Sequence, residues 1–165
     1  MKQPGTLFDR TDRALAGWMA ANGITLLRIS LGIIFLWFGA LKFVPGLSAA
    51  ESLATRTIGV LSFGLISADA ARLILAAWES LIGIGLLSGR YLRIVLLLLW
   101  VQMLGTVTPI LIFPQEVFAI FPYAPTLEGQ YIFKNLVLIS AGIVIGGTVR
   151  GGRLVSEPWQ AAGPS

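Results

Sequence analysis

Residues 28–45 read RISLGIIFLWFGALKFVP, and this stretch decides the fold. The run is long enough to cross a bilayer as a helix, and a cation lies near each end. At 100° per residue, both cations share one narrow stripe with two glycines and a phenylalanine: Arg28, Gly32, Phe35, Gly39 and Lys42. Glycines let helix backbones approach closely, and charges inside a membrane face protein or water. The stretch therefore predicts a membrane helix that packs its polar stripe against neighbouring helices.

The composition of the whole chain agrees with a membrane protein. Of its 165 residues, 56% are hydrophobic and 12% are charged, whereas about 25% of residues are charged in an ordinary soluble domain. Polar residues cannot cover so much apolar surface, so we expect the lipid bilayer to be the solvent. The length suits one compact domain of about four spans.

Two residue types are missing from the sequence, and their absence limits the chemistry. The chain has no cysteine and no histidine. We therefore expect no thiol exchange, no metal site and no catalytic residue, and no cofactor held covalently or through metal ligands. The net charge of +4 comes from cations beside apolar runs, which favours roles in topology and in contact with lipid headgroups. We do not expect nucleic acid as a partner.

Four apolar runs predict an all-α fold, an integral membrane four-helix bundle over residues 23–149. The expected spans are residues 24–43, 70–88, 93–113 and 129–149. The first run ends at Pro45-Gly46 and the second at Gly89, both of which are helix-stop signals. Pro109 lies in the last turns of the third run.

The segments outside the spans carry separate expectations. Residues 1–22 form a cytoplasmic N-terminal tail that is either a short interfacial helix or a frayed end. Within the connection of residues 44–71, residues 53–67 predict a short helix on the membrane surface. Residues 114–128 are rich in proline and aromatic residues, which predicts a structured loop at the membrane interface. Residues 150–165 form a Gly/Pro-rich cytoplasmic C-terminal tail.

The distribution of cations predicts the topology. Four spans place both termini on one side, together with the short turn between spans two and three. That side collects eight cations and the other side four, so the positive-inside rule places both termini in the cytoplasm and the chain in the inner (cytoplasmic) membrane. The residues we assign as topology anchors are Arg28, Arg90, Arg93 and Arg150.

Each span carries polar residues on one face, which predicts a polar interior in the outer half of the bundle. Glu79 is the only acid well inside a span, and we expect it to pair with Lys42 or Lys134. The arrangement is either a proton-linked or ligand-binding site or an ion pair that fixes helix register. The candidate polar membrane site contains Lys42, Glu79, Gln102, Thr106, Gln130, Lys134 and Asn135.

The stretch of residues 28–45 also resembles the first helix of the DoxX-like membrane proteins. The resemblance is closest to the branch of the inner-membrane reactive-chlorine-resistance protein. It continues in order through the other spans: Glu79 with Ile82-Gly83, the turn Thr106-Val107-Thr108-Pro109, and Gly129 through Lys134-Asn135 to Gly142. The resemblance implies a four-helix inner-membrane protein. The wider family is linked with thiosulfate:quinone oxidoreductase subunits and with oxidative-stress complexes that contain soluble redox partners.

Three functions follow as hypotheses. The first is an accessory component of a redox or oxidative-stress system, with no redox centre of its own. In that role the chain is not an enzyme by itself; it is a candidate membrane subunit of an oxidoreductase complex, with a soluble or membrane redox partner protein and with quinone as a candidate cofactor. The second is a small proton-coupled transporter or permease that acts as a homo-oligomer. The third is a scaffold whose charges only lock the bundle.

Overall fold

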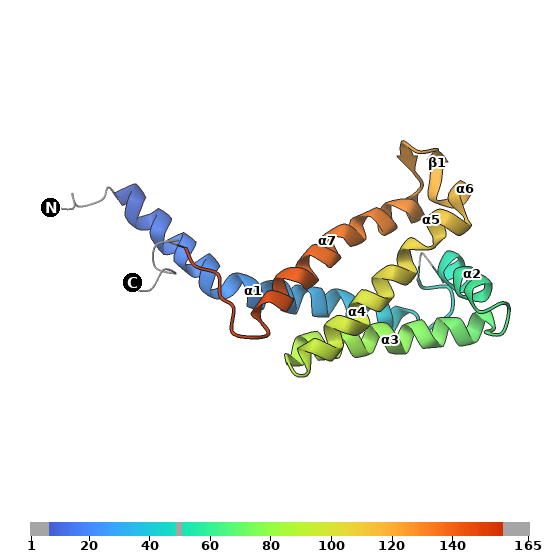
Figure 1. Ribbon diagram of the computed structural model, residues 1–165, viewed down its shortest axis with the longest axis horizontal. Helices are drawn as coiled ribbons and strands as arrows, with labels where there is room; N and C mark the ends of the chain where they lie inside the picture. Colours follow the sequence, from blue (N-terminus) through green and yellow to red (C-terminus); the bar gives the residue numbers. More distant parts are fainter. Residues whose placement is uncertain (1–6, 49–50, 157–165) are drawn as a thin grey trace.

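The computed structural model describes residues 7–48 and 51–156, and this part of the chain contains four helices long and apolar enough to cross a membrane (Figure 1). This confirms the predicted all-α, four-helix membrane bundle. The spans are α1 (Leu7–Leu41), α3 (Ala68–Ser88), α4 (Leu92–Val107) with its continuation α5 (Pro109–Ile112), and α7 (Leu127–Thr148). The ends of both predicted tails, Lys2 among them, lie outside the described residues.

Local sequence signals set the helix ends. The hydroxyl of Ser67 accepts a hydrogen bond from the backbone N–H of Ala70 at 3.3 Å and begins α3. Gly89 ends the same helix in the left-handed conformation, with φ of 67°. Thr126 begins α7 by accepting from the backbone N–H of Gly129 at 3.1 Å. Pro109 has no N–H to donate, and α4 accordingly ends at Val107 before α5 resumes.

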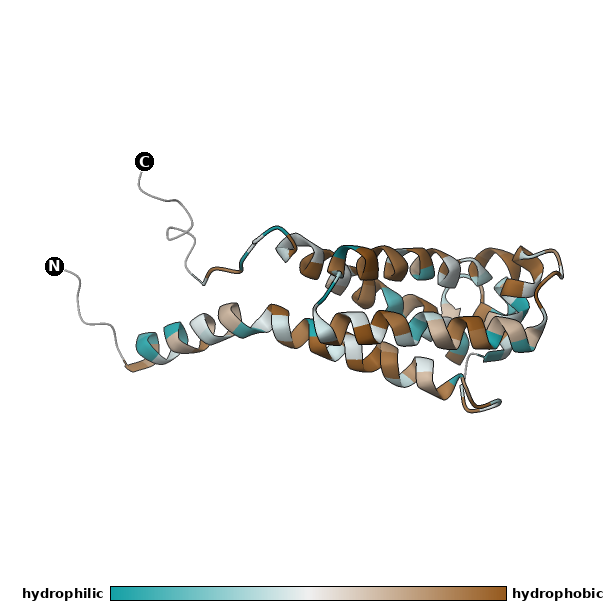
Figure 2. Cartoon of the chain, turned by 90° about the horizontal axis from the view of Figure 1, so that it is seen from below, coloured by the Kyte–Doolittle hydropathy of each residue, from teal (hydrophilic) through white to brown (hydrophobic). Residues whose placement is uncertain are grey.

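The first helix is longer than the apolar run within it. Residues 7–22, expected to be a short interfacial helix or a frayed end, are instead the first turns of the continuous 35-residue α1. At a rise of 1.5 Å per residue α1 is about 52 Å long, against about 30 Å for the hydrocarbon core of a bilayer. Its N-terminal part projects beyond the other helices and is more hydrophilic than the bundle (Figures 1 and 2).

The opposite end of the bundle is covered by short elements (Figure 1). These are the helices α2 (Glu51–Leu61) and α6 (Pro114–Val117), followed by a two-stranded antiparallel hairpin of β1 (Phe118–Ile120) and β2 (Ala124–Pro125). Residues 53–67, predicted to form a surface helix, contribute only Leu53–Leu61 to helical structure. Leu53 is buried in a small core with Val117 and Phe118, so α2 packs against protein.

Glycines hold α1 and α3 together. A Cβ atom at Gly83 would lie 2.4 Å from the backbone nitrogen of Leu36, and one at Gly39 would lie 2.7 Å from that of Ser80. Side chains larger than hydrogen therefore do not fit at these two positions, and the helices touch backbone to backbone. The main core continues from this contact into α4 and α7, through Leu31, Phe35, Ile82, Leu86, Leu99 and Ile145.

Candidate functional site

A buried ion pair joins α1 to α3. Nζ of Lys42 lies 2.6 Å from Oε2 of Glu79, and each residue is only 8% exposed. The sequence predicts Lys42 or Lys134 as the partner of Glu79, and in the structure the partner is Lys42. The second oxygen of Glu79, Oε1, accepts a hydrogen bond from Nε2 of Gln102 on α4 at 2.7 Å. Both carboxylate oxygens therefore have partners, as a buried carboxylate requires.

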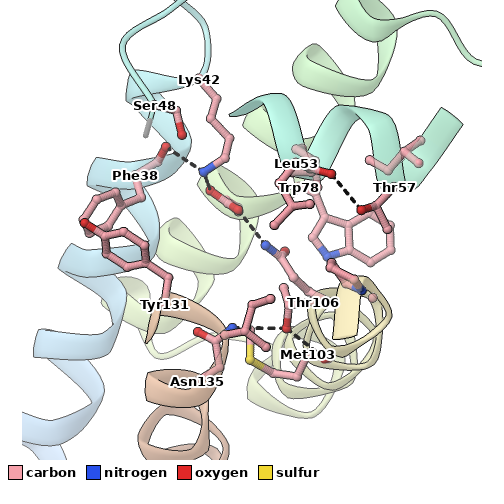
Figure 3. A pocket seen from close by; sticks show the side chains of 18 of the residues that line it. Phe38, Lys42, Ser48, Leu53, Thr57, Trp78, Met103, Thr106, Tyr131 and Asn135 are labelled. Carbon is pink, nitrogen blue, oxygen red and sulfur yellow. Dashed lines mark hydrogen bonds and ion pairs between the residues drawn. The ribbon is translucent and has the colours of Figure 1, made fainter. Parts of the chain in front are cut away.

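The sequence of α1 brings this pair together. Lys42 follows Gly39 by one helical turn, and a Cβ atom at Gly39 would lie only 2.9 Å from Cβ of Glu79. Lys42 lies in the turn just past the end of α1, and the close approach of the two helices lets its side chain reach the carboxylate. Nζ of Lys42 also donates to the backbone carbonyl of Phe38 at 3.3 Å (Figure 3). Two of its three N–H groups are thus accounted for.

Arg72 supports the pair from the outer end of α3. Its guanidinium donates to the backbone carbonyls of Lys42 at 2.8 Å and Phe43 at 3.1 Å, which lack partners at the end of α1. It also forms ion pairs with Glu51 at 3.8 Å and Asp69 at 3.4 Å. The place of Arg72 on the same stripe of α3 as Glu79 was the signal for this role.

A cavity of about 470 Å³ lies beside the ion pair, bounded by α1, α2, α3, α4, α5 and α7. Lys42, Glu79 and Gln102 line it, and most of its other walls are apolar. Figure 3 shows side chains from several of these helices around the space. The apolar lining residues include Phe35, Phe38, Leu53, Ile74, Trp78, Met103, Ile132 and Leu138. The cavity therefore combines one polar wall with a mainly apolar interior, which is the usual form of a site for a small organic molecule.

A second polar pair lines the same cavity. Nδ2 of Asn135 on α7 donates to the hydroxyl of Thr106 on α4 at 3.1 Å, and this hydroxyl donates to the backbone carbonyl of Met103 at 2.9 Å (Figure 3). Lys134 also lines the cavity, and its ammonium lies 5.8 Å from the centre of the Tyr131 ring. This distance is at the limit of the usual range for a cation–π contact. Lys134, the second of the two partners expected for Glu79, makes this contact and no ion pair with Glu79.

Gln130 is the one expected site residue that the structure does not bring to the cavity. Its side chain is exposed at the first turns of α7 and is not part of the cavity wall. The structure thus assembles six of the seven predicted residues around one space. The aromatic residues Phe113, Phe118, Phe121 and Tyr123, in and beside the predicted interface loop, do not line this cavity. Phe118 is buried against Phe121 and Phe133.

Helix α2 forms one wall of the cavity and is attached by two ion pairs, one at its start and one at its middle. Glu51 at its start pairs with Arg72, and Arg56 pairs with Glu116 of α6. The guanidinium of Arg56 also lies 4.9 Å from the centre of the Phe113 ring. The hydrogen bond between Arg56 and Glu116 lowers the pKa of the Glu116 carboxyl and raises that of the guanidinium.

One of the predicted topology anchors has a structural role as well. Arg28 donates through Nη1 to the backbone carbonyls of Leu86 and Leu87, which lie in the last turn of α3. A cation at a helix C-terminus satisfies free carbonyls and is favoured by the helix dipole. The other three anchors, Arg90, Arg93 and Arg150, are exposed.

Comparisons with known proteins give the chain a family. Neither the curated proteins nor the solved structures gave a match. The DoxX family model matches residues 23–113, which run from α1 through the ion pair and Gln102 to the end of span three. This match covers more than half of the 165-residue chain. The chain is therefore a multi-pass membrane protein that belongs to the DoxX family.

Proposed function

We propose that this chain is an accessory component of a redox or oxidative-stress system in the inner membrane, and that its cavity binds a membrane quinone. The observation that carries the proposal is the 470 Å³ cavity whose polar wall contains Lys42, Glu79 and Gln102. Its volume falls in the range of about 300–1,000 Å³ that is typical of small-molecule sites.

The residues of the cavity fit a quinone. A quinone has an apolar tail and a ring that bears oxygens, and the cavity has mainly apolar walls with a smaller number of polar groups. Asn135, Lys134 and Gln102 carry N–H groups, the kind of donor that the carbonyl oxygens of a quinone ring accept from. A quinone bound there would supply two-electron redox chemistry, while the residues of this chain hold and orient its ring.

A partner protein completes the proposed system. The sequence contains neither cysteine nor histidine, so we assign electron transfer to a soluble or membrane redox protein that meets the chain at the bilayer. Such a role agrees with the resemblance to the branch of the reactive-chlorine-resistance protein. We also propose that the termini are cytoplasmic, because eight of the twelve cations belong to that side.

Extraction of the protein in mild detergent tests the proposal. We expect wild-type protein to retain quinone, detectable by chromatography of an organic extract, and to copurify with an oxidoreductase. Ala54 lines the cavity from α2, so Ala54→Phe should fill part of the space while leaving Lys42, Glu79 and Gln102 in the sequence, and quinone should be lost. Ala77→Phe is the matched control, because Ala77 is exposed on α3 and does not line the cavity. Equal quinone in both variants would contradict a site in this cavity.

A second candidate is a small proton-coupled transporter that acts as a homo-oligomer. The observation that favours it is the buried Glu79–Lys42 pair, because ionisable groups inside a membrane are costly and commonly serve proton or ion movement. Its test is flux in proteoliposomes. A transporter would lose proton-driven flux in Glu79→Gln, and it would carry flux in the wild type without any redox partner.

A further inference from the structure

The four spans contact one another in a ring, and one of the four seams between them lacks polar bridges. Side-chain hydrogen bonds or ion pairs join α1 to α3, α3 to α4 and α4 to α7. Between residues 24–48 and α7, by contrast, the described part of the chain contains no hydrogen bond and no ion pair. The α1–α7 seam is instead packed through apolar core residues such as Leu31 and Ile145. Because no polar contact has to be broken there and lipid can replace apolar contacts, this seam parts most readily.

The α1–α7 seam is closed at one end and widens toward the other. Figure 1 shows α7 diverging from α1 toward the end of the bundle that carries β1. Along this seam, Ile34 and Phe38 of α1 and Tyr131 and Lys134 of α7 line the cavity. Ile34, Phe38 and Tyr131 are nevertheless 41%, 50% and 43% exposed, and the exposed surface of a span faces lipid. The cavity wall at this seam therefore consists of side chains that lipid can reach.

The seam between α3 and α4 is the competing route out of the cavity. Ile74 of α3 and Val101 of α4 also line the cavity, and each is 48% exposed. Two hydrogen bonds cross this seam, however: the bond from Gln102 to Glu79, and a bond from Nε1 of Trp78 to a backbone carbonyl of α4 at 3.2 Å. A ligand that passed between α3 and α4 would have to break these bonds, whereas the α1–α7 seam requires no such loss.

We propose that the cavity opens to the bilayer through the α1–α7 seam, and that the tail of its ligand lies in this seam and ends in lipid. The inference rests on the quinone site proposed above. A cavity of about 470 Å³ suits a drug-sized ring system, whereas a membrane quinone also carries a long isoprenoid tail that this volume cannot hold. The ring therefore occupies the cavity and the tail leaves past Ile34 and Phe38. The ligand class is an amphiphile that enters from the bilayer, and not a solute that enters from water.

Competition between quinones that share a ring and differ in tail length tests the inference. Wild-type protein is reconstituted into liposomes that contain equal amounts of ubiquinone-2 and ubiquinone-10, extracted in mild detergent, and its bound quinones are separated by chromatography. We expect the protein to retain the long-tailed form at least as well as the short-tailed form, because the tail lies outside the cavity. Retention of the short-tailed form alone would show an enclosed site and overturn the inference, while the quinone site would stand. Retention of neither form above protein-free liposomes would overturn both proposals.

Two tryptophan variants identify the seam. Ile34→Trp obstructs the α1–α7 seam, and we expect it to lower the ratio of retained long-tailed to short-tailed quinone about tenfold. Ile74→Trp is the matched control, because Ile74 also lines the cavity and is half-exposed but lies at the α3–α4 seam, and its ratio should equal that of the wild type. If Ile34→Trp does not fold, Phe38→Trp obstructs the same seam. An unchanged ratio in the α1–α7 variants would overturn the inference, and a lowered ratio in Ile74→Trp would then place the tail between α3 and α4.

Discussion

The Lys42–Glu79 pair places two opposite charges where only 8% of each residue is exposed. Removing charges from water costs several kcal/mol for each ion, and attraction offsets this cost only when both partners are present. The pair is therefore a poor device for stability alone, since an apolar pair of similar volume would serve as well. Both partners also line the cavity, where the proposed ligand would meet them.

Removal of one partner should be costly. We expect Lys42→Met to lower the free energy of unfolding by about 3–5 kcal/mol, because Glu79 is then left in a buried site without its cation. Adding Glu79→Leu should restore most of this loss. Thermal unfolding in detergent, followed by circular dichroism, measures both effects. If Lys42→Met were as stable as the wild type, the carboxylate of Glu79 would have to be effectively solvated without its cation.

The residues of the site were predictable to different degrees. The stripe of residues 28–42 placed Lys42 on the inner face of its helix, and the cost of an unpaired acid predicted a cation beside Glu79. The bond from Gln102 depends on how α3 and α4 are rotated about their axes, which periodicity does not fix. Gln130 lies one turn before Lys134 on α7, displaced from it by about 40° around the helix, and its side chain is exposed outside the cavity wall.

At the scale of elements, the contact of α1 with α3 depends on glycine. Gly83→Ala places a Cβ atom 2.4 Å from the backbone nitrogen of Leu36, so the two helices must separate. We expect a loss of about 1–3 kcal/mol, as for other overpacked cores. Gly17→Ala is the matched control in α1, because a Cβ atom there meets nothing within 4 Å. That variant should be unchanged or up to about 1 kcal/mol more stable.

The attachment of α2 should depend on pH. Its ion pair with α6 lowers the pKa of Glu116 below the usual value of 4.5. The pair therefore contributes fully above that value, and the contribution is lost as the pH falls through the lowered pKa. A spin label at Ser52→Cys on α2 should become more mobile in this acidic range. In Glu116→Gln the mobility should be the same at neutral and acidic pH, and a retained pH response would assign the effect to another group.

The elements differ in how far sequence patterns determine them. The spans follow from long apolar runs with Gly and Pro at their ends, and these signals are local. The extension of α1 to Leu7 was missed because residues 7–22 are polar, although nothing in them breaks a helix. The place of α2 against α3 and α6 depends on contacts between distant segments, which an interrupted apolar pattern could not reveal.

At the scale of the whole molecule, the start of α1, the turn between α3 and α4, and the end of α7 lie at one end of the bundle (Figure 1). The chain has no cysteine, so single cysteines report topology directly. We expect a membrane-impermeant maleimide added to intact spheroplasts to label Ser52→Cys and to leave Ser88→Cys unlabelled until the membrane is opened. The reverse pattern would place the termini outside.

The cavity is a property of the assembled bundle, because α1, α2, α3, α4, α5 and α7 all contribute to its walls. Its polar residues could be listed from the sequence, while its volume and its apolar walls could not. We propose that this cavity binds a ligand, and that its buried charges do more than fix the register of the helices.

The quinone content of purified Lys42→Met/Glu79→Leu protein tests this claim most directly. The double variant should fold with nearly the stability of the wild type, since an apolar pair replaces the ion pair. Because both charged groups of the polar wall are removed, we predict that its quinone content falls to the level of Ala54→Phe, while Ala77→Phe keeps the wild-type content. A folded double variant that retains as much quinone as the wild type would contradict the account.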